Sequence, residues 1–178
     1  MDARSVAAGV LVVATMMLVA ACGDEGSETS TTEVSAESYA NIMCSQAVDW
    51  SAVSTEIAGY QAGTATYDDV VRAQTPAQDG TESFILNVRG MPQPDDATQK
   101  ATYTSLQETA DALSNRWVAI ASDIDNLKLK TSAPHAQAQI ELLYGDLKTS
   151  VAHLDELYPD AGIAADVDSR ANCEPLQA

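Results

Sequence analysis

YTSLQETADALSNRWVAIASDIDNL, residues 103–127, is the stretch that decides the fold of this 178-residue chain. Its large apolar residues recur at alternating intervals of three and four, at Tyr103, Leu106, Ala110, Leu113, Trp117, Ile120, Ile124 and Leu127. This spacing places them on one side of a helix and leaves the polar residues on the other side. A long helix with a one-sided apolar stripe must bury that stripe against other helices. The stretch therefore predicts an all-α helical bundle.

Two further segments carry apolar residues at helical spacing. The first begins near Ser35 and contains Tyr39, Ile42, Met43, Trp50, Val53, Ile57 and Tyr60. The second ends before Pro159 and contains Ile140, Leu143, Leu147, Val151, Leu154 and Tyr158. Because the connections between helices are short, successive helices should run antiparallel, in up-down-up-down order.

The second leg of this bundle is predicted to be broken. Thr66 and Asp69 form a capping-box pattern that begins a helix, and this helix should stop before Pro76. Residues 79–89 contain the apolar run FILNV, which fits either a helix or a strand. We prefer a helix, because a single strand would have no partner elsewhere in the chain.

A broken leg beside the long third helix would leave a notch on the surface. Phe84, Leu86 and Met91 flank the end of the second leg and are the expected lining residues. Residues 90–94, GMPQP, then interrupt the chain before Asp95 and Asp96, which are placed to cap the third helix.

Charge excludes some classes of partner. The formal net charge is -17, with 9 basic against 26 acidic residues. A nucleic-acid-binding protein needs a basic face, so nucleic acid is not an expected partner. The same charge argues against a domain that lies flat on anionic lipid.

The N-terminus indicates the compartment. Residues 1–21 contain one basic residue, Arg4, followed by an uncharged run over 5–21 that has the length of a signal-peptide core. The run ends in LVAAC, residues 18–22, which resembles the lipobox of bacterial lipoproteins. The resemblance implies cleavage before Cys22 and a diacylglycerol, with palmitate-type chains, on that cysteine. The protein would then be anchored in the cell membrane by this lipid, on the extracytoplasmic face.

The remaining chain divides into a tether and a domain. Residues 22–34 carry the lipidated cysteine and a polar, acidic Ser/Thr-rich tether whose dozen residues extend at most about 40 Å. Whether its hydroxyl groups are glycosylated stays open. Residues 35–178 form the bundle, and their last part, 160–178, shows no apolar stripe and is expected to be an irregular tail.

Export leaves two cysteines, Cys44 and Cys173, in a compartment where disulfides persist. One disulfide between them is the natural prediction, and two free buried thiols or a metal pair are the alternatives. Because the bundle has an even number of antiparallel helices, the chain after the last helix returns to the end where the first helix begins. This brings the C-terminal tail near Cys44, which supports the bridge. It would close a loop of roughly 130 residues and stabilise the fold by at most about 5 kcal/mol.

Catalytic and metal-binding patterns are missing from the sequence. His135 and His153 lack the Glu-x-x-His spacing of di-iron bundles, and the acidic pairs lack the spacing of a calcium loop. There is no nucleophile elbow, phosphate loop or dinucleotide fingerprint. The aromatic residues Trp50 and Trp117 lie on the helical stripes and are expected in the core. We therefore predict no catalytic residues, no metal and no cofactor.

The domain is similar in layout to the small acidic helical lipoproteins of high-GC Gram-positive cell envelopes. The shared features are the Ser/Thr tether, an early and a late cysteine, and a proline-rich break before a long helix. Most of these proteins have no assigned activity. Our first hypothesis is a non-enzymatic lipoprotein that binds a partner protein or another component of the envelope. The alternative is a carrier that holds a small apolar or lipidic ligand between its helices.

Overall fold

The structure, a computed structural model, describes residues 36–177, which all belong to one compact unit spanning Glu33–Ala178. The predicted signal peptide, Cys22 and the tether lie outside the described residues. Within the described range every regular element is helical, and no strand occurs. The elements are α1 (Ala36–Ala62), α2 (Tyr67–Arg89), α3 (Ala97–Asp125), α4 (Ser132–Leu157), η1 (Pro159–Ala161), α5 (Ile163–Ser169), η2 (Ala171–Cys173) and α6 (Glu174–Gln177).

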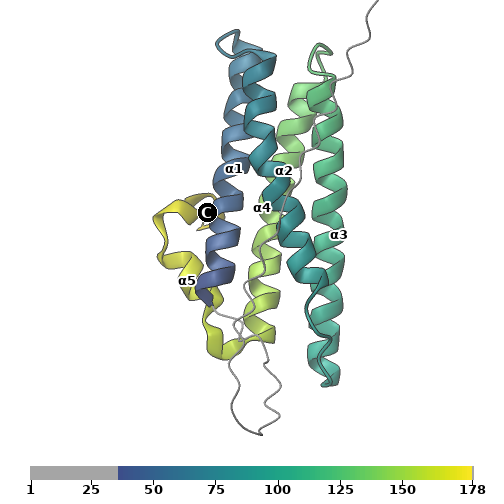
Figure 1. Cartoon of the computed structure of the whole chain (residues 1–178), viewed down its shortest axis with the longest axis vertical. Helices are drawn as coiled ribbons and strands as arrows, with labels where there is room; N and C mark the ends of the chain where they lie inside the picture. The colour runs from purple at the N-terminus through teal and green to yellow at the C-terminus, as the bar shows by residue number, and fades with distance from the viewer. Residues whose placement is uncertain (1–35, 178) are drawn as a thin grey trace, which may run out of the picture. The chain divides into compact units, whose positions relative to one another are not determined.

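The four long helices form the predicted up-down-up-down bundle (Figure 1). We call the end that holds the start of α1, the connection 90–96 and the end of α4 the base. The opposite end, with the connections 63–66 and 126–131, is the tip. The all-α prediction is confirmed.

The predicted stripe of α3 faces the interior. Every position of the stripe is buried except Tyr103, which is half-buried. The stripe packs mainly against α4 and also against α2. Two ion pairs join these helices outside the core: Arg116 with Asp146 on α4, and Arg89 of α2 with Asp111 at 2.6 Å. The Arg89–Asp111 pair is exposed and contributes little to stability, whereas the Arg116–Asp146 pair is half-buried. The apolar stripe supplies most of the buried surface of α3.

The prediction of a broken second leg is wrong. α2 is one continuous helix of 23 residues with Pro76 inside it, and residues 79–89 are helical. The predicted capping box at its start is present, with Asp69 N–H donating to the Thr66 hydroxyl and Thr66 N–H donating to the Asp69 carboxylate. A proline inside a helix costs about 3 kcal/mol. The apolar surface that α2 buries before and after Pro76, against α1 and α3, outweighs that cost.

The expectation of an irregular tail is also wrong. Residues 159–177 form short helices, and α5 and α6 pack against α1 and α4. Ile163, Val167 and Leu176 are buried there together with Cys173. α5 contains only 7 residues, which is just under two turns. A stripe of two apolar residues is too short to be recognised as a period.

Candidate functional site

The expected notch does not form. Phe84 and Met91 are buried in the core, whereas Leu86 is 67% exposed. Because α2 is continuous, Phe84 and Leu86 lie two positions apart on one helix and point to nearly opposite sides. These residues share no surface, so they cannot line one site.

A hollow lies close to that position, at the base of the bundle. Its volume is about 320 Å³. The connection 90–96, the first turns of α3 and the end of α4 enclose it. We call it the base hollow; it is lined by Pro92, Gln93, Pro94, Asp95, Gln99, Tyr103, Leu157 and Tyr158. Sequence reasoning placed the chain break here correctly but assigned the lining to Phe84, Leu86 and Met91, none of which lines the hollow.

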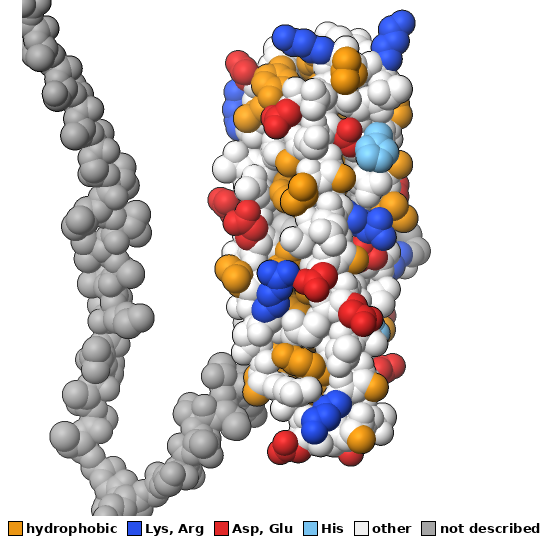
Figure 2. Space-filling model, turned by 90° about the vertical axis from the view of Figure 1, so that its right-hand side faces the viewer, with side chains coloured by type: hydrophobic (Ala, Val, Ile, Leu, Met, Phe, Trp, Pro, Cys, Tyr) orange, Lys and Arg blue, Asp and Glu red, His pale blue; other side chains and the backbone are white. Residues whose placement is uncertain are grey.

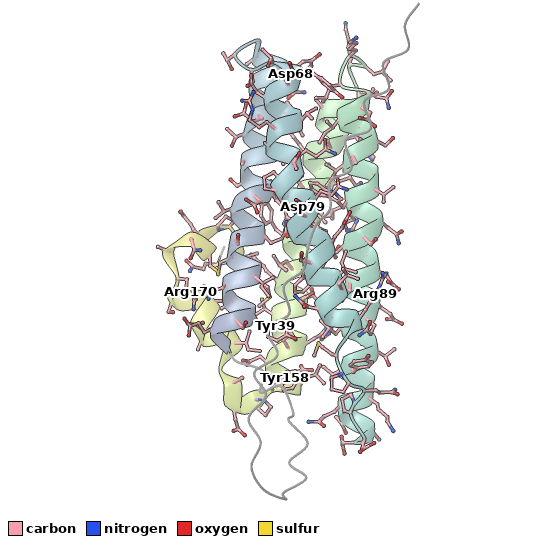
Figure 3. All side chains as sticks on the ribbon, viewed as in Figure 1. Tyr39, Asp68, Asp79, Arg89, Tyr158 and Arg170 are labelled. Carbon is pink, nitrogen blue, oxygen red and sulfur yellow. A yellow bond between two sulfur atoms is a disulfide. The ribbon has the colours of Figure 1, made fainter. Side chains whose placement is uncertain are left out.

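Two tyrosines, Tyr103 and Tyr158, line the base hollow. Figure 3 shows Tyr39, near the start of α1, and Tyr158, after α4, at the same end of the bundle. Burial raises the pKa of Tyr158, and the neighbouring Tyr103 raises it further. Burial and then Tyr158 raise the pKa of Tyr39. The Tyr103 hydroxyl donates to the carbonyl of Met91 at 3.1 Å, which holds the connection 90–96 against α3.

The rim of the base hollow is acidic. Asp96 is the N-cap of α3, where its carboxylate accepts from the N–H groups of Thr98 and Gln99 at 2.8 and 3.1 Å. Asp95 is exposed and takes part in no ion pair among residues 36–177. An aromatic and proline wall next to an unpaired carboxylate suits an apolar group that carries a positive charge.

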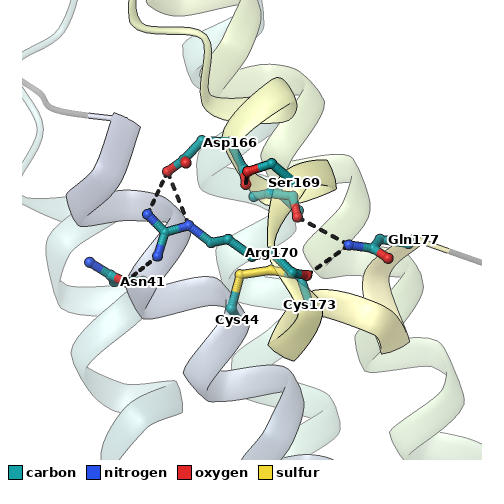
Figure 4. A network of polar contacts seen from close by, with 8 residues as sticks. Asn41, Cys44, Asp166, Ser169, Arg170, Cys173 and Gln177 are labelled. Carbon is teal, nitrogen blue, oxygen red and sulfur yellow. Dashed lines mark hydrogen bonds and ion pairs between the residues drawn. A yellow bond between two sulfur atoms is a disulfide. The ribbon is translucent and has the colours of Figure 1, made fainter.

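The C-terminal segment is fastened to α1 by a disulfide and by a polar network. Cys44 and Cys173 form the predicted disulfide, and both are fully buried. Figure 4 shows the network beside it, in which the Arg170 guanidinium donates to the carboxylate of Asp166 and to the side-chain oxygen of Asn41. These contacts join α5 to the first turns of α1. The segment is therefore part of the folded unit.

The middle of the bundle contains a buried polar layer. Gln46 Nε2 donates to the carbonyl of Ala77 at 3.0 Å, and Trp50 Nε1 donates to the hydroxyl of Thr81 at 3.1 Å. Tyr144 packs edge-on against Trp50 with ring centroids 5.8 Å apart. Trp50 and Trp117 are buried, as predicted. The two tryptophans belong to the core and provide no exposed binding platform.

The histidines lie on α4 and do not meet. His135 Nδ1 lies 2.6 Å from Asp123 Oδ2 of α3, a pairing that sequence reasoning missed. His153 is half-buried and lies near the other end of α4. Within residues 36–177 no three His, Cys, Asp or Glu side chains converge as a metal site would require.

No helix in the described part of the chain combines the length and the apolarity needed to cross a bilayer. Comparison of the chain with protein-family models, curated proteins and solved structures finds no match. Any assignment of function therefore depends on the residues described above.

Proposed function

We propose that this protein is an extracytoplasmic lipoprotein, anchored by a lipid on Cys22, whose helical bundle is a non-enzymatic binding module of the cell envelope. The observation that carries the proposal is the disulfide between Cys44 and Cys173. Disulfides persist in oxidising compartments and are rare in the cytosol. The disulfide therefore supports export, and the lipobox over residues 18–22 supports retention at the membrane.

The architecture is compatible with such an anchor. The chain enters the bundle at the base, where α1 begins at Ala36. Residues 22–34 would join the lipid to this end, with a reach of about 40 Å when extended. Anchoring confines the module to two dimensions and raises its effective concentration for partners at the membrane.

The two ends of the bundle are the best candidates for binding. The base hollow lies at one end, and a second hollow of about 400 Å³ lies at the tip, lined by Tyr67, Asp125, Leu127 and Lys128. Neither of these hollows lies between the helices at mid-height. These two hollows therefore support surface contacts at the ends of the bundle.

Anchoring is tested by lipid labelling in cells. Wild-type protein should incorporate an alkyne-tagged palmitate and partition into the detergent phase, and Cys22→Ser should lose both properties. The double variant Cys44→Ser/Cys173→Ser is the matched control, because it removes two cysteines but keeps the lipobox. Retention of label by Cys22→Ser would refute the anchor.

The binding role is tested by native mass spectrometry on the protein extracted from its own membranes. A second polypeptide in stoichiometric amount would support the binding module. A discrete small-molecule mass beyond the Cys22 lipid, which survives desalting, would favour the carrier instead.

A further inference from the structure

The tip of the bundle presents an apolar side chain between two cations. The connection from α3 to α4 reads NLKLKT over residues 126–131. Leu127 is buried beneath it, whereas Leu129 is 58% exposed and both Lys128 and Lys130 are exposed. Figure 2 shows blue Lys and Arg side chains at the top of the bundle, with hydrophobic side chains directly below them. We call Lys128, Leu129 and Lys130 the tip triad.

The tip triad is held in place by its own backbone. The N–H of Leu129 donates to the carbonyl of Asn126 at 2.8 Å, and the carbonyl of Leu129 accepts from the N–H of Ser132 at 3.2 Å. These bonds fix the backbone on both sides of the exposed leucine. A fixed turn has little backbone freedom left to lose on binding, which favours a docking role.

The opposite end of the same chain offers the complementary surface. The base hollow has walls of Pro92, Pro94, Tyr103 and Tyr158, and its volume of about 320 Å³ exceeds that of a leucine side chain. Asp95 on its rim has no ion-pair partner within residues 36–177, and the same holds for Lys128 and Lys130. An apolar group between cations thus matches an apolar hollow with a free carboxylate.

We propose that the tip triad of one copy docks into the base hollow of a second copy, so that the bundles associate end to end. Leu129 would enter the hollow between Tyr103 and Tyr158, and Lys128 or Lys130 would pair with Asp95. This contact is heterologous, because it joins two different surfaces, and it leaves one free tip and one free base on every assembly. Chains longer than two copies follow in detergent solution, where a tether of about 40 Å does not hold every base near one bilayer.

End-to-end contact also suits the large negative charge. Two copies that each carry a net charge of -17 repel each other when their sides meet. α3 alone is about 43 Å long, since it contains 29 residues at 1.5 Å each. At physiological salt the screening length is about 8 Å, so in an end-to-end pair most charges on the two sides lie beyond each other's reach.

Association is measured first on the full-length protein in a non-ionic detergent, by sedimentation velocity over a wide concentration range. Wild type should form species larger than a dimer as concentration rises. Leu129→Asp should weaken association at least tenfold, and so should Asp95→Lys. Leu86→Asp is the control, because Leu86 is an exposed leucine at neither end, and it should associate like wild type.

Mixing the two variants gives the sharpest result. Leu129→Asp retains an intact base and Asp95→Lys retains an intact tip, so the two variants should associate in an equimolar mixture although neither associates alone. Carbodiimide treatment of mixed isotope-labelled and unlabelled wild type should yield amide cross-links from Lys128 or Lys130 of one copy to Asp95 of another. An amide bond between these ends cannot form within one copy, because the whole length of α3 separates them.

Three results would overturn the proposal. The first is a wild type that stays monomeric at the highest concentration, and the second is association that Leu129→Asp leaves intact. The third is a monomer whose binding to phosphatidylglycerol vesicles depends on Leu129, because that would assign the tip triad to an anionic lipid surface. The test does not depend on the lipid at Cys22, so its failure and that of the proposed anchor are distinguishable.

Discussion

Gly80 lies inside α2 at a position where alanine should be harmful, although alanine normally stabilises a helix. A Cβ added at Gly80 would lie 2.5 Å from Gln46 Oε1 and 3.3 Å from Gln46 Cδ. Gln46 is 1% exposed, and its Nε2 donates to the carbonyl of Ala77. The Oε1 end of the amide would have to move, and because Gln46 is buried we expect this movement to disrupt the Nε2 hydrogen bond.

Two opposing terms set the magnitude. Replacing glycine by alanine in a helix interior gains about 1 kcal/mol. Leaving a buried amide without its hydrogen bond costs about 1–3 kcal/mol. We therefore expect Gly80→Ala to destabilise the bundle by about 1 kcal/mol, which lowers Tm by about 2–4 °C in a domain of this size.

The assay is urea and thermal unfolding followed by circular dichroism, with the disulfide intact. Gly145→Ala is the matched control, because Gly145 is an exposed glycine inside α4 with nothing within 4 Å of an added Cβ. It should stabilise the protein by about 1 kcal/mol. In a Gln46→Ala background the clash is gone, so Gly80→Ala should become stabilising. If Gly80→Ala stabilises wild type as much as Gly145→Ala does, the reasoning is refuted.

Three further predictions concern the core and its fastening. Cys44→Ser/Cys173→Ser should lower the free energy of unfolding by 2 to about 5 kcal/mol in urea titrations, because the disulfide closes a loop with a sequence separation of 129, and an unchanged midpoint would contradict this. Burial, and then Glu141, raises the pKa of Tyr144 to about 12. The Tyr144 hydroxyl therefore ionises at lower pH in the unfolded state than in the folded state. Its contribution to the free energy of unfolding should be fully present below pH 10 and fall as pH rises toward 12, and Tyr144→Phe should reduce this fall. Phe84→Ala should cost about 3–5 kcal/mol and Leu86→Ala less than about 0.5 kcal/mol, whereas similar costs would mean that both side chains share an environment.

Local patterns explain why the helices could be predicted. The α3 stripe repeats over seven intervals, and each of its residues except Tyr103 is buried. The capping box at Thr66 and the cap at Asp96 depend on hydrogen bonds between residues two or three positions apart. Because such signals are contained within one helix, they can be read without knowledge of the partner helices.

The base hollow could be predicted only in part. The run GMPQP correctly marked a break between α2 and α3. Its lining also needs Leu157 and Tyr158, which lie more than 50 positions later and reach the base only because α4 runs antiparallel to α3. Likewise, nothing local shows that Leu129 is exposed while Leu127 is buried.

The sequence by itself determined the all-α class, the order of the long helices and the pairing of Cys44 with Cys173, because periodicity, short connections and a count of two cysteines are sufficient for these. Only the tertiary structure decided that α2 continues through Pro76, that Phe84 is buried, and that the C-terminal segment is helical. These outcomes depend on whether burial against distant helices outweighs a local cost. A proline costs about 3 kcal/mol wherever it interrupts a helix, but the burial that offsets this cost comes from α1 and α3.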